Sequence, residues 1–514
     1  MKNRYLSMVF LGAMGVCNHS AYATSTTLQS MSDSELSATT GQALMSLSYI
    51  APNDAANLER QRSGGEQGVG FYKLGLEAKL ELNANIRNLQ LGCGGTNGTG
   101  GCDIDIKNLS LSGLNDGVEA GSTNPSEGSP TFNNGRASTS AEITNPFIEF
   151  AIKNPNSAST REFVGLRLSA EKINALLTAG IANNATPSTT DGIQSLSGYM
   201  QIANTTGHVY TKESTFGLGS SNCLPRASGC ESIGGKVKTL LGDRYFRSLP
   251  TDGGTTGITV PSLKVDFTLP AFTVNGTRQT QAVAENVSAK IPWLPIAAAG
   301  NCPAGYAASC ASANSQIAGV NYSNDKLRVL LTEDGNSTTW TGDCISILFI
   351  CAVSNSNFAM AAGSAITDLN VNITFKQALS MIHNIPLTGT GGYLSLQKQA
   401  LQWPGANSDD IAQKGWWMSF AQPVQLGYLQ AQNKVDISAV LPQVASFATT
   451  ALLAGDRIDV SSLGDTGTAL TNGVLSKQLQ INLSNSPAAM LTLENQQLKN
   501  QKVPTNCYGS LSFC

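Results

Sequence analysis

Ten of the eleven cysteines lie in five close couples, and their thiol groups are the side chains whose spacing most directly suggests chemistry. In an oxidising compartment, neighbouring thiols form local disulfides, each of which closes a small loop. Each bridge is expected to contribute about 2–3 kcal/mol by restricting the unfolded chain. The couples are Cys93 with Cys102, Cys223 with Cys230, Cys302 with Cys310, Cys344 with Cys351, and Cys507 with Cys514.

Zinc binding is the competing interpretation of these cysteines, and their spacing argues against it. Zinc sites normally combine C-x2-C or C-x4-C couples with histidines. None of the five couples is so closely spaced, and only His208 and His383 follow residue 23. We therefore expect five local disulfides, with no metal and no cofactor.

Catalytic motifs are not evident among the remaining polar residues. The sequence contains neither G-x-S-x-G nor H-E-x-x-H, and the two histidines that follow residue 23 give a catalytic triad little support. Asp103 and Asp105 share one face of an expected strand, where a solvated outer face is favoured over a calcium site. Asp409 and Asp410 are expected in a polar loop after Pro404. We expect no enzyme, and a hydrolase with two carboxylates is the third hypothesis.

One candidate contact surface lies between Cys344 and Cys351, where Ile345, Leu348 and Phe349 make an apolar filling. A bridge between these cysteines forbids one straight strand, because seven extended residues cover about 23 Å and bridged Cα atoms lie within about 7 Å. Either the loop bulges with its apolar side chains gathered, or the cysteines pair elsewhere. An exposed apolar tip would suit a partner or a surface; burial in the core is the alternative.

Trp416 and Trp417 form the second candidate contact surface, because aromatic rings near Lys414 could stack on sugar rings. Adjacent residues on a strand point to opposite faces. The alternative is therefore that one tryptophan is buried and the other partly covered.

The N-terminus predicts export. Lys2 and Arg4 precede an apolar stretch over 5–16, and Ala21-Tyr22-Ala23 has the form that signal peptidase requires, so residues 1–23 are expected to be a signal peptide. Its removal takes two of the 32 basic residues and none of the 35 acidic ones, which changes the formal charge from −3 to −5. This charge implies no nucleic-acid partner, and no other stretch predicts a transmembrane span.

Composition and periodicity predict a mainly β fold. Charged residues make up only 13% of the chain, and from Leu74 to Ile86 every second residue is apolar, which is typical of a strand with one apolar and one solvated face. We expect elongated, sandwich-like antiparallel sheets with a few short helices. Expected helices cover 53–62, 170–181 and 441–453, and a capping box at Ser32 to Glu35 opens another.

A hairpin closed by a Cys93–Cys102 disulfide can be tested by asking which residues face each other across its two strands. In such a hairpin the numbers of the facing residues sum to 195. In this register four facing pairs are apolar on both strands: Leu91 with Ile104, Leu89 with Ile106, Ile86 with Leu109, and Ala84 with Leu111. The apolar parity also changes on both sides near Arg87-Asn88 and Lys107-Asn108, which predicts a paired bend.

Further strands are expected at 147–152, 163–168, 199–202, 262–269, 327–331, 369–375, 393–396 and 479–483. A Gly- and Ser-rich loop covers 112–142. We divide the chain after the signal into a short helical head at 24–62, a β-rich domain at 63–300, and a second β-rich region at 301–514.

The segment from Leu28 to Ser37, followed by Thr40-Gly41-Gln42-Ala43, resembles a head motif in exported Gram-negative proteins. Among them are FilA-like proteins of pilus or fimbrial assembly clusters. The resemblance implies a fimbria-associated subunit or tip component, with other fimbrial subunits, a chaperone or an usher as partners. Gln501 stands where chaperone–usher pilins have glycine, although Phe513 is the penultimate aromatic.

From these features we expect an exported structural protein, adhesive and involved in pilus assembly, at the cell surface, on a fimbrium or outside the cell. Its ligand would be a surface or a glycan. The alternative is a periplasmic or secreted ligand-binding protein for a sugar or an apolar ligand.

Overall fold

The computed structural model describes residues 45–503, with gaps at 115–139, 218–222, 241, 250–255, 299, 301, 317–319, 334, 336–344, 348–349, 354, 391, 425 and 502. The residues from Met45 onward form one unit by their contacts. Strands dominate it, and the helices in the described part are short. The mainly β fold class expected from the sequence is therefore confirmed.

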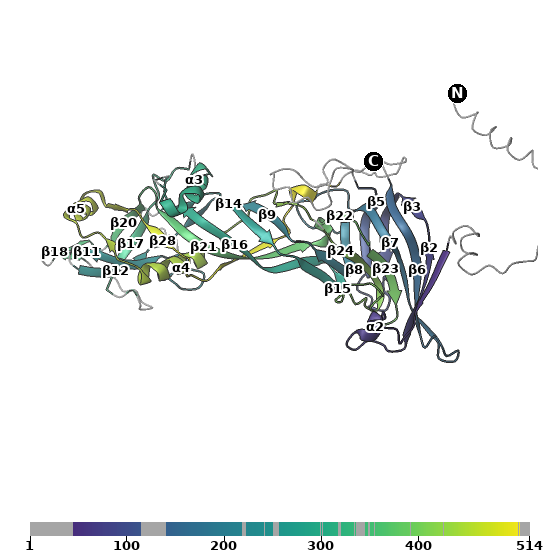
Figure 1. Cartoon of the computed structure of the whole chain (residues 1–514). Coiled ribbons are helices and arrows are strands. Elements are labelled where there is room, and N and C mark those ends of the chain that lie inside the picture. Colours follow the sequence, from purple (N-terminus) through teal and green to yellow (C-terminus); the bar gives the residue numbers. More distant parts are fainter. Residues whose placement is uncertain are drawn as a thin grey trace, which may run out of the picture. The chain divides into compact units, whose positions relative to one another are not determined.

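The first sheet has twelve strands, and Figure 1 labels most of them. Its main path runs β1-β2-β6-β7-β23-β24-β8-β5-β4. The strands are β1 (Met45–Ile50), β2 (Val69–Leu76), β3 (Lys79–Leu82), β4 (Ala84–Leu91), β5 (Ile104–Ser112), β6 (Ala141–Lys153), β7 (Glu162–Ala179), β8 (Gly192–Ile202), β15 (Phe272–Gln279), β22 (Asn384–Leu387), β23 (Gly392–Gln397) and β24 (Gly415–Val424).

Part of this sheet closes on itself. β7 pairs with β23, β23 with β24, β24 with β8, β8 with β5, and β5 again with β7. β1 lies outside this circuit and pairs only with β2 among the described residues.

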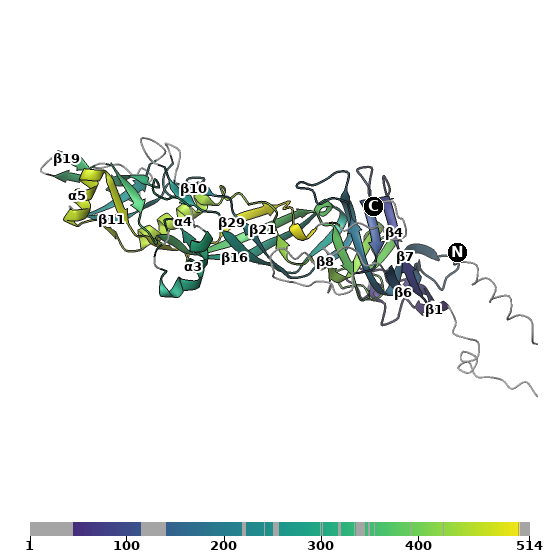
Figure 2. The same cartoon turned by 90° about the horizontal axis from the view of Figure 1, so that it is seen from above.

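A second sheet of seven strands is organised around two long strands, β16 (Gln281–Pro295) and β21 (Ala365–Ala378), which pair antiparallel and run side by side in Figure 2. Its other strands are β9 (Thr205–Tyr210), β14 (Lys264–Leu269), β25 (Leu429–Gln430), β28 (Gln480–Asn482) and β29 (Ala489–Glu494).

A third sheet has six strands in the order β26-β11-β12-β17-β20-β27. They are β11 (Gly234–Thr239), β12 (Gly242–Ser248), β17 (Leu327–Thr332), β20 (Asn355–Met360), β26 (Ile458–Asp459) and β27 (Val474–Lys477). Two small hairpin-like sheets complete the strands: β10 (Ser214–Phe216) with β13 (Ile258–Val260), and β18 (Ile345–Ile347) with β19 (Ile350–Val353).

The helices are α2 (Leu58–Gln61), α3 (Ala307–Gln316), α4 (Leu441–Ala454) and α5 (Leu463–Asn472). α4 confirms the helix expected at 441–453, and its apolar side packs into the main core through Val444, Ala448 and Leu452. α2 is shorter than the helix expected at 53–62, because Asn57 caps it by accepting from the backbone N–H of Arg60. None of the described helices is long and apolar enough to span a membrane.

The helix expected at 170–181 is wrong, because these residues continue β7 as far as Ala179. Residues 175–179 are buried one after another, and β22 and β5 pair with them. A strand covered on both faces loses its alternation and can imitate the spacing of a helix.

The hairpin register is confirmed, because β4 and β5 pair Leu91 with Ile104 and Ala84 with Leu111. The expected bend is also present, since Asn108 has a left-handed φ of 54° and the ladder has no pair between Arg87 and Asn108. Asparagine tolerates this conformation better than most residues.

Other expectations need correction. The alternating run from Leu74 to Ile86 is divided among β2, β3 and β4, and its apolar residues Leu80 and Leu82 are exposed. Six of the strand pairs are parallel, not antiparallel. Each large sheet takes strands from both sides of residue 300, so the sheets do not follow the expected division there.

Candidate functional site

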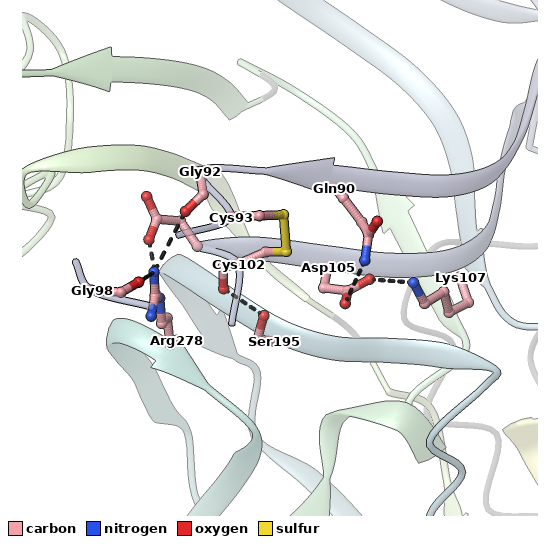
Figure 3. Close-up of a disulfide and its surroundings, with 10 residues drawn as sticks. Gln90, Gly92, Cys93, Gly98, Cys102, Asp105, Lys107, Ser195 and Arg278 are labelled. Atoms are coloured by element: carbon pink, nitrogen blue, oxygen red, sulfur yellow. Dashed lines mark hydrogen bonds and ion pairs between the residues drawn. A yellow bond between two sulfur atoms is a disulfide. The ribbon is translucent and has the colours of Figure 1, made fainter. Parts of the chain in front are cut away.

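The disulfide between Cys93 and Cys102 joins the ends of β4 and β5, and Figure 3 shows its surroundings. Arg278, at the end of β15, donates from its guanidinium to the backbone oxygens of Gly92 (3.4 Å) and Gly98 (3.1 Å). Ser195 Oγ on β8 donates to the carbonyl oxygen of Cys102 at 2.8 Å. The bridge is therefore tied to two further strands of the first sheet.

Asp103 follows this bridge and is only 1% exposed, which corrects the solvated outer face expected for it. Its Oδ1 pairs with Arg278 Nε at 3.2 Å and accepts from Asn97 Nδ2 at 2.9 Å. Its Oδ2 accepts from the backbone N–H of Trp416 at 3.0 Å. The carboxylate is saturated by protein donors, and it fixes the disulfide loop to β24.

Asp105 has different partners from Asp103. Its carboxylate pairs with Lys107 Nζ at 2.9 Å and accepts from Gln90 Nε2 at 3.1 Å (Figure 3). Among the described residues, no group of three or more histidine, cysteine or acidic side chains is arranged to hold a metal ion. Asp103 and Asp105 are structural groups of the hairpin.

The outward face of the first sheet carries two uninterrupted apolar rows across six strands, β1, β2, β6, β7, β23 and β24. Cross-strand register defines both rows, because each member is paired with the next. The first row is Leu47, Leu74, Ile148, Leu168, Leu394 and Met418; the second is Tyr49, Tyr72, Phe150, Leu166, Leu396 and Trp416. We call these twelve residues the outer apolar face.

Solvent reaches most of the outer apolar face. Leu47 is 76% exposed, and Tyr49, Ile148, Leu168 and Leu396 are also exposed. At the β24 end, Leu394, Trp416 and Met418 are partly buried against the main core. Contiguous apolar surface of this kind is unusual on a monomer and marks a contact region.

Among the described residues, the strand at one end of this face pairs along one edge only. β1 has the sequence Met-Ser-Leu-Ser-Tyr-Ile, without a charge or a proline. Natural sheets usually protect a free edge with lysine, proline, a bulge or a covering segment. β1 therefore presents backbone groups and apolar side chains to a further strand.

The opposite face of the same strands is buried around an ion pair. Arg167 on β7 and Glu149 on β6 stand directly opposite each other and pair through their side chains, which are 6% and 2% exposed. Arg167 also donates to the carbonyl oxygen of Pro404 at 2.9 Å. Burial raises the pKa of the Glu149 carboxyl, and the charge of Arg167 opposes that rise.

Three aromatic rings surround the guanidinium of Arg167. Its central carbon lies 5.3 Å from the ring centre of Phe147 and 5.4 Å from those of Tyr393 and Trp403. Cation–π attraction adds to the ion pair in fixing this side chain. Arg167 is therefore held rigidly before any ligand arrives.

A cavity of about 270 Å³ opens beside Arg167. Strands β6, β7, β23 and β24 contribute Phe147, Arg167, Tyr393 and Ser419 to its wall, and the segment 404–410 contributes the rest of one side. Its volume lies near the lower end of the range for small-molecule sites, about 300–1,000 Å³. We call it the Arg167 cavity.

Asp410 supplies the carboxylate of this cavity and is 1% exposed. It accepts from Trp417 Nε1 at 3.0 Å and from Ser419 Oγ. Burial raises the pKa of its carboxyl. Within the described residues it forms no ion pair with a lysine, arginine or histidine, so its charge is balanced only by hydrogen bonds.

A larger hollow of about 760 Å³ lies beside the end of α4, β26 and β28. Three of the charged residues in its lining are paired, Arg457 with Asp243, Asp459 with Lys238, and Lys477 with Asp465, and the fourth, Asp456, is exposed. Unlike the Arg167 cavity, it offers no buried charge in need of a partner.

The structure places the two candidate tryptophans on opposite faces of β24. Trp417 is fully buried behind Asp410, and Trp416 is half-buried in the outer apolar face. The ring of Trp417 is therefore inaccessible to a sugar in solution.

The other candidate contact surface is only partly described. Residues 345–347 and 350–353 form the antiparallel pair β18–β19, so this stretch is not one straight strand. The side chains of Ile345, Leu348 and Phe349 lie outside the described residues.

Three of the five expected disulfides are present: Cys93–Cys102, Cys223–Cys230 and Cys302–Cys310. The side chains of Cys344, Cys351, Cys507 and Cys514 lie outside the described residues. So do the signal peptide, the head motif with its capping box, and residues 115–139 of the expected loop. The three bridges are compatible with an exported protein.

Neither histidine is placed for catalysis. His208 is buried and shares a hydrogen bond with Tyr428 Oη through Nδ1 (2.8 Å). His383 Nδ1 bonds the carbonyl oxygen of Ala179 (2.7 Å), and burial lowers the pKa of this imidazole. Both are core residues.

Sequence reasoning missed the pair Glu149 and Arg167. A signal was present, because each is a single charge in the middle of a correctly predicted strand, between large apolar residues. Their opposite signs could have suggested that the two strands are neighbours.

Comparison of the chain with protein-family models, with curated proteins and with solved structures finds no match.

Proposed function

We propose that this chain is an exported, non-catalytic structural protein of the cell surface, associated with a fimbria, which works through strand-mediated contacts between subunits. The outer apolar face, together with the free edge of β1, is the observation that carries the proposal. The N-terminal resemblance to FilA-like proteins of pilus clusters supports the same setting. The local disulfides would protect such a protein outside the cell.

The partner to which we assign the β1 edge is a second copy of this chain. Two β1 strands can pair antiparallel about a two-fold axis with Ser48 opposite Ser48 of the second copy. Leu47 then faces Tyr49 of the second copy, so each apolar row continues into the partner sheet. Because β1 carries no charge, this pairing meets no electrostatic repulsion.

Surface shearing with fractionation tests the proposed location. The protein is expected in the sheared appendage fraction, together with other high-molecular-weight surface material. A purely soluble periplasmic pool would overturn the proposal and favour the alternative of a periplasmic ligand-binding protein.

The contact itself is tested by light scattering on the purified exported protein. The double variant Leu47→Lys/Tyr49→Lys places charges on the edge and is expected to dissociate the dimer. Leu463→Lys is the matched control, because Leu463 on α5 is equally exposed, at 78%. A wild-type protein that is monomeric at high micromolar concentration would contradict the pairing.

A further inference from the structure

The Arg167 cavity is a built site, independent of the outer apolar face. Arg167 is 5% exposed, and its Nε is buried without a hydrogen-bond partner among the described residues. Its other nitrogens are already engaged with Glu149 and Pro404. Arg167 therefore forms a fixed part of the wall, and hydrogen bonds to a ligand fall to the other polar residues of the lining.

The charges around the cavity disfavour an anionic ligand. Arg167 is neutralised by Glu149, and Glu171 by Lys73 Nζ at 3.2 Å. Asp410 remains as an acceptor in the wall, and among the described residues no cationic side chain pairs with it. An anion would therefore meet the carboxylate of Asp410.

The remaining polar groups can together donate a hydrogen bond to a ligand hydroxyl and accept one from it. Asp410 accepts hydrogen bonds, and Asn407 and Thr390 in the lining can both donate and accept them. A ligand with several hydroxyl groups on one edge matches this alternation of donors and acceptors.

Much of the remaining lining is apolar. It includes the rings of Phe147 and Tyr393 and the small side chains of Ala170, Ala406 and Ala421. Sugar rings combine an apolar C–H face with a hydroxyl edge, and protein sites for them combine aromatic rings with a few placed polar groups. The volume of about 270 Å³ limits the ligand to one ring.

We propose that the Arg167 cavity binds one uncharged sugar ring, with its hydroxyl edge held by Asp410 and Asn407 and its apolar face against Phe147 and Tyr393. This site adds ligand recognition to the assembly role proposed above and does not depend on it. A surface protein with such a site could hold the terminal residue of a glycan.

The test uses the exported protein and saturation-transfer NMR with four neutral monosaccharides: glucose, galactose, mannose and N-acetylglucosamine. At least one is expected to bind saturably at millimolar concentration. Glucuronate, which carries a negative charge, is expected to bind more weakly than glucose. No binding by any neutral sugar, or tighter binding of glucuronate than of glucose, would overturn the proposal.

Two variants locate the binding in the cavity. Ala406→Leu adds a larger side chain to the wall and is expected to weaken binding at least about tenfold. Phe147→Leu removes one of the two rings assigned to the apolar face of the ligand and is expected to weaken binding measurably if Ala406→Leu does not fold. Phe150→Leu is the matched control on the outer apolar face and should leave binding unchanged. Unchanged affinity in both cavity variants would overturn the assignment.

Discussion

Arg167 and Glu149 stand opposite each other on β7 and β6, and their ion pair is almost completely withdrawn from water, with side chains 6% and 2% exposed. The pair lies directly beneath the outer apolar face, since its neighbours Ile148 and Leu168 point outward. One pair of strands therefore provides both the wall of the Arg167 cavity and the surface assigned to assembly.

Glu149→Gln is expected to destabilise the fold by about 3–5 kcal/mol, because it leaves the buried guanidinium of Arg167 without its counter-charge. Urea unfolding at neutral pH measures this change. The double variant Glu149→Leu/Arg167→Met removes both charges and should cost less than the sum of the two single variants.

Lys398→Gln provides the control for a surface pair. Lys398 Nζ and Glu162 lie 3.2 Å apart with side chains 63% and 52% exposed, so the loss should stay within about 1 kcal/mol. Equal losses at the two pairs would contradict the role given to burial.

Asp103 and Asp105 allow a comparison of two carboxylates on the same strand end. Asp103→Asn removes the negative charge that pairs with Arg278 and replaces one of the two oxygens that accept hydrogen bonds. It should lower the free energy of unfolding by about 3 kcal/mol. Asp105→Asn affects a pair that keeps some contact with solvent, with the Lys107 and Asp105 side chains 17% and 18% exposed, and should cost less, about 1 kcal/mol. Thermal unfolding of both variants under one set of conditions makes the comparison, and a larger loss at Asp105 would contradict it.

The parts of the fold that local pattern determines could be predicted from the sequence. The β4–β5 register followed from the cysteine spacing and the apolar pairs, and α4 from its apolar run. The end of β7 could not be predicted, because tertiary pairing on both sides produced a continuous buried run that resembles a helix.

The candidate sites were harder to predict for a related reason. Alternation shows that a strand has an apolar face, but not which face the rest of the chain covers. Here the segment 401–412 packs with Phe71 and Trp417 on the inner face, which leaves Leu47 and Leu168 outside. Asp410 looked like an ordinary loop residue, because its burial depends on Trp417 and Ser419 from a separate strand.

The pH dependence of stability should carry the signature of Asp410. Burial raises the pKa of its carboxyl, so between the unfolded and folded pKa values the folded state binds more protons. The ionised Asp410 carboxylate lowers the free energy of unfolding. This loss is absent below the pKa of Asp410 in the unfolded chain, about 4, and is complete above its pKa in the folded protein. As the pH falls from about 7 toward 4, the wild type should gain stability relative to Asp410→Asn.

For Asp436→Asn we expect the opposite pH dependence: the wild type should lose stability relative to this variant as the pH falls. Its backbone hydrogen bond with Ser438 lowers the pKa of Asp436, so its stabilising contribution is lost as the pH falls below the unfolded value. Denaturant titrations of the three proteins from about pH 7 down to about pH 2 cover both the Asp410 and the Asp436 effects. Parallel profiles for the wild type and Asp410→Asn would contradict the assignment to Asp410.

Gly198 is required by close strand packing. It lies on β8 between β24 and β15, and a Cβ there would stand 2.0 Å from the backbone oxygen of Met418. Gly198→Ala should therefore cost about 1–3 kcal/mol or more through overpacking. Gly467→Ala in α5 has open space and should stabilise by about 1 kcal/mol through helix propensity. Calorimetry distinguishes the two, and a stabilised Gly198→Ala would contradict the packing argument.

The spacing argument that correctly identified three bridges predicts two more, Cys344–Cys351 and Cys507–Cys514. Mass spectrometry of non-reduced peptides from the exported protein should recover all five couples and no free thiol. Replacing Cys93 and Cys102 by serine should cost about 2–3 kcal/mol, because the unfolded chain regains the freedom of a short loop. Bridges between distant couples, or an unchanged midpoint of unfolding in this variant, would contradict the local pairing on which the hairpin register was built.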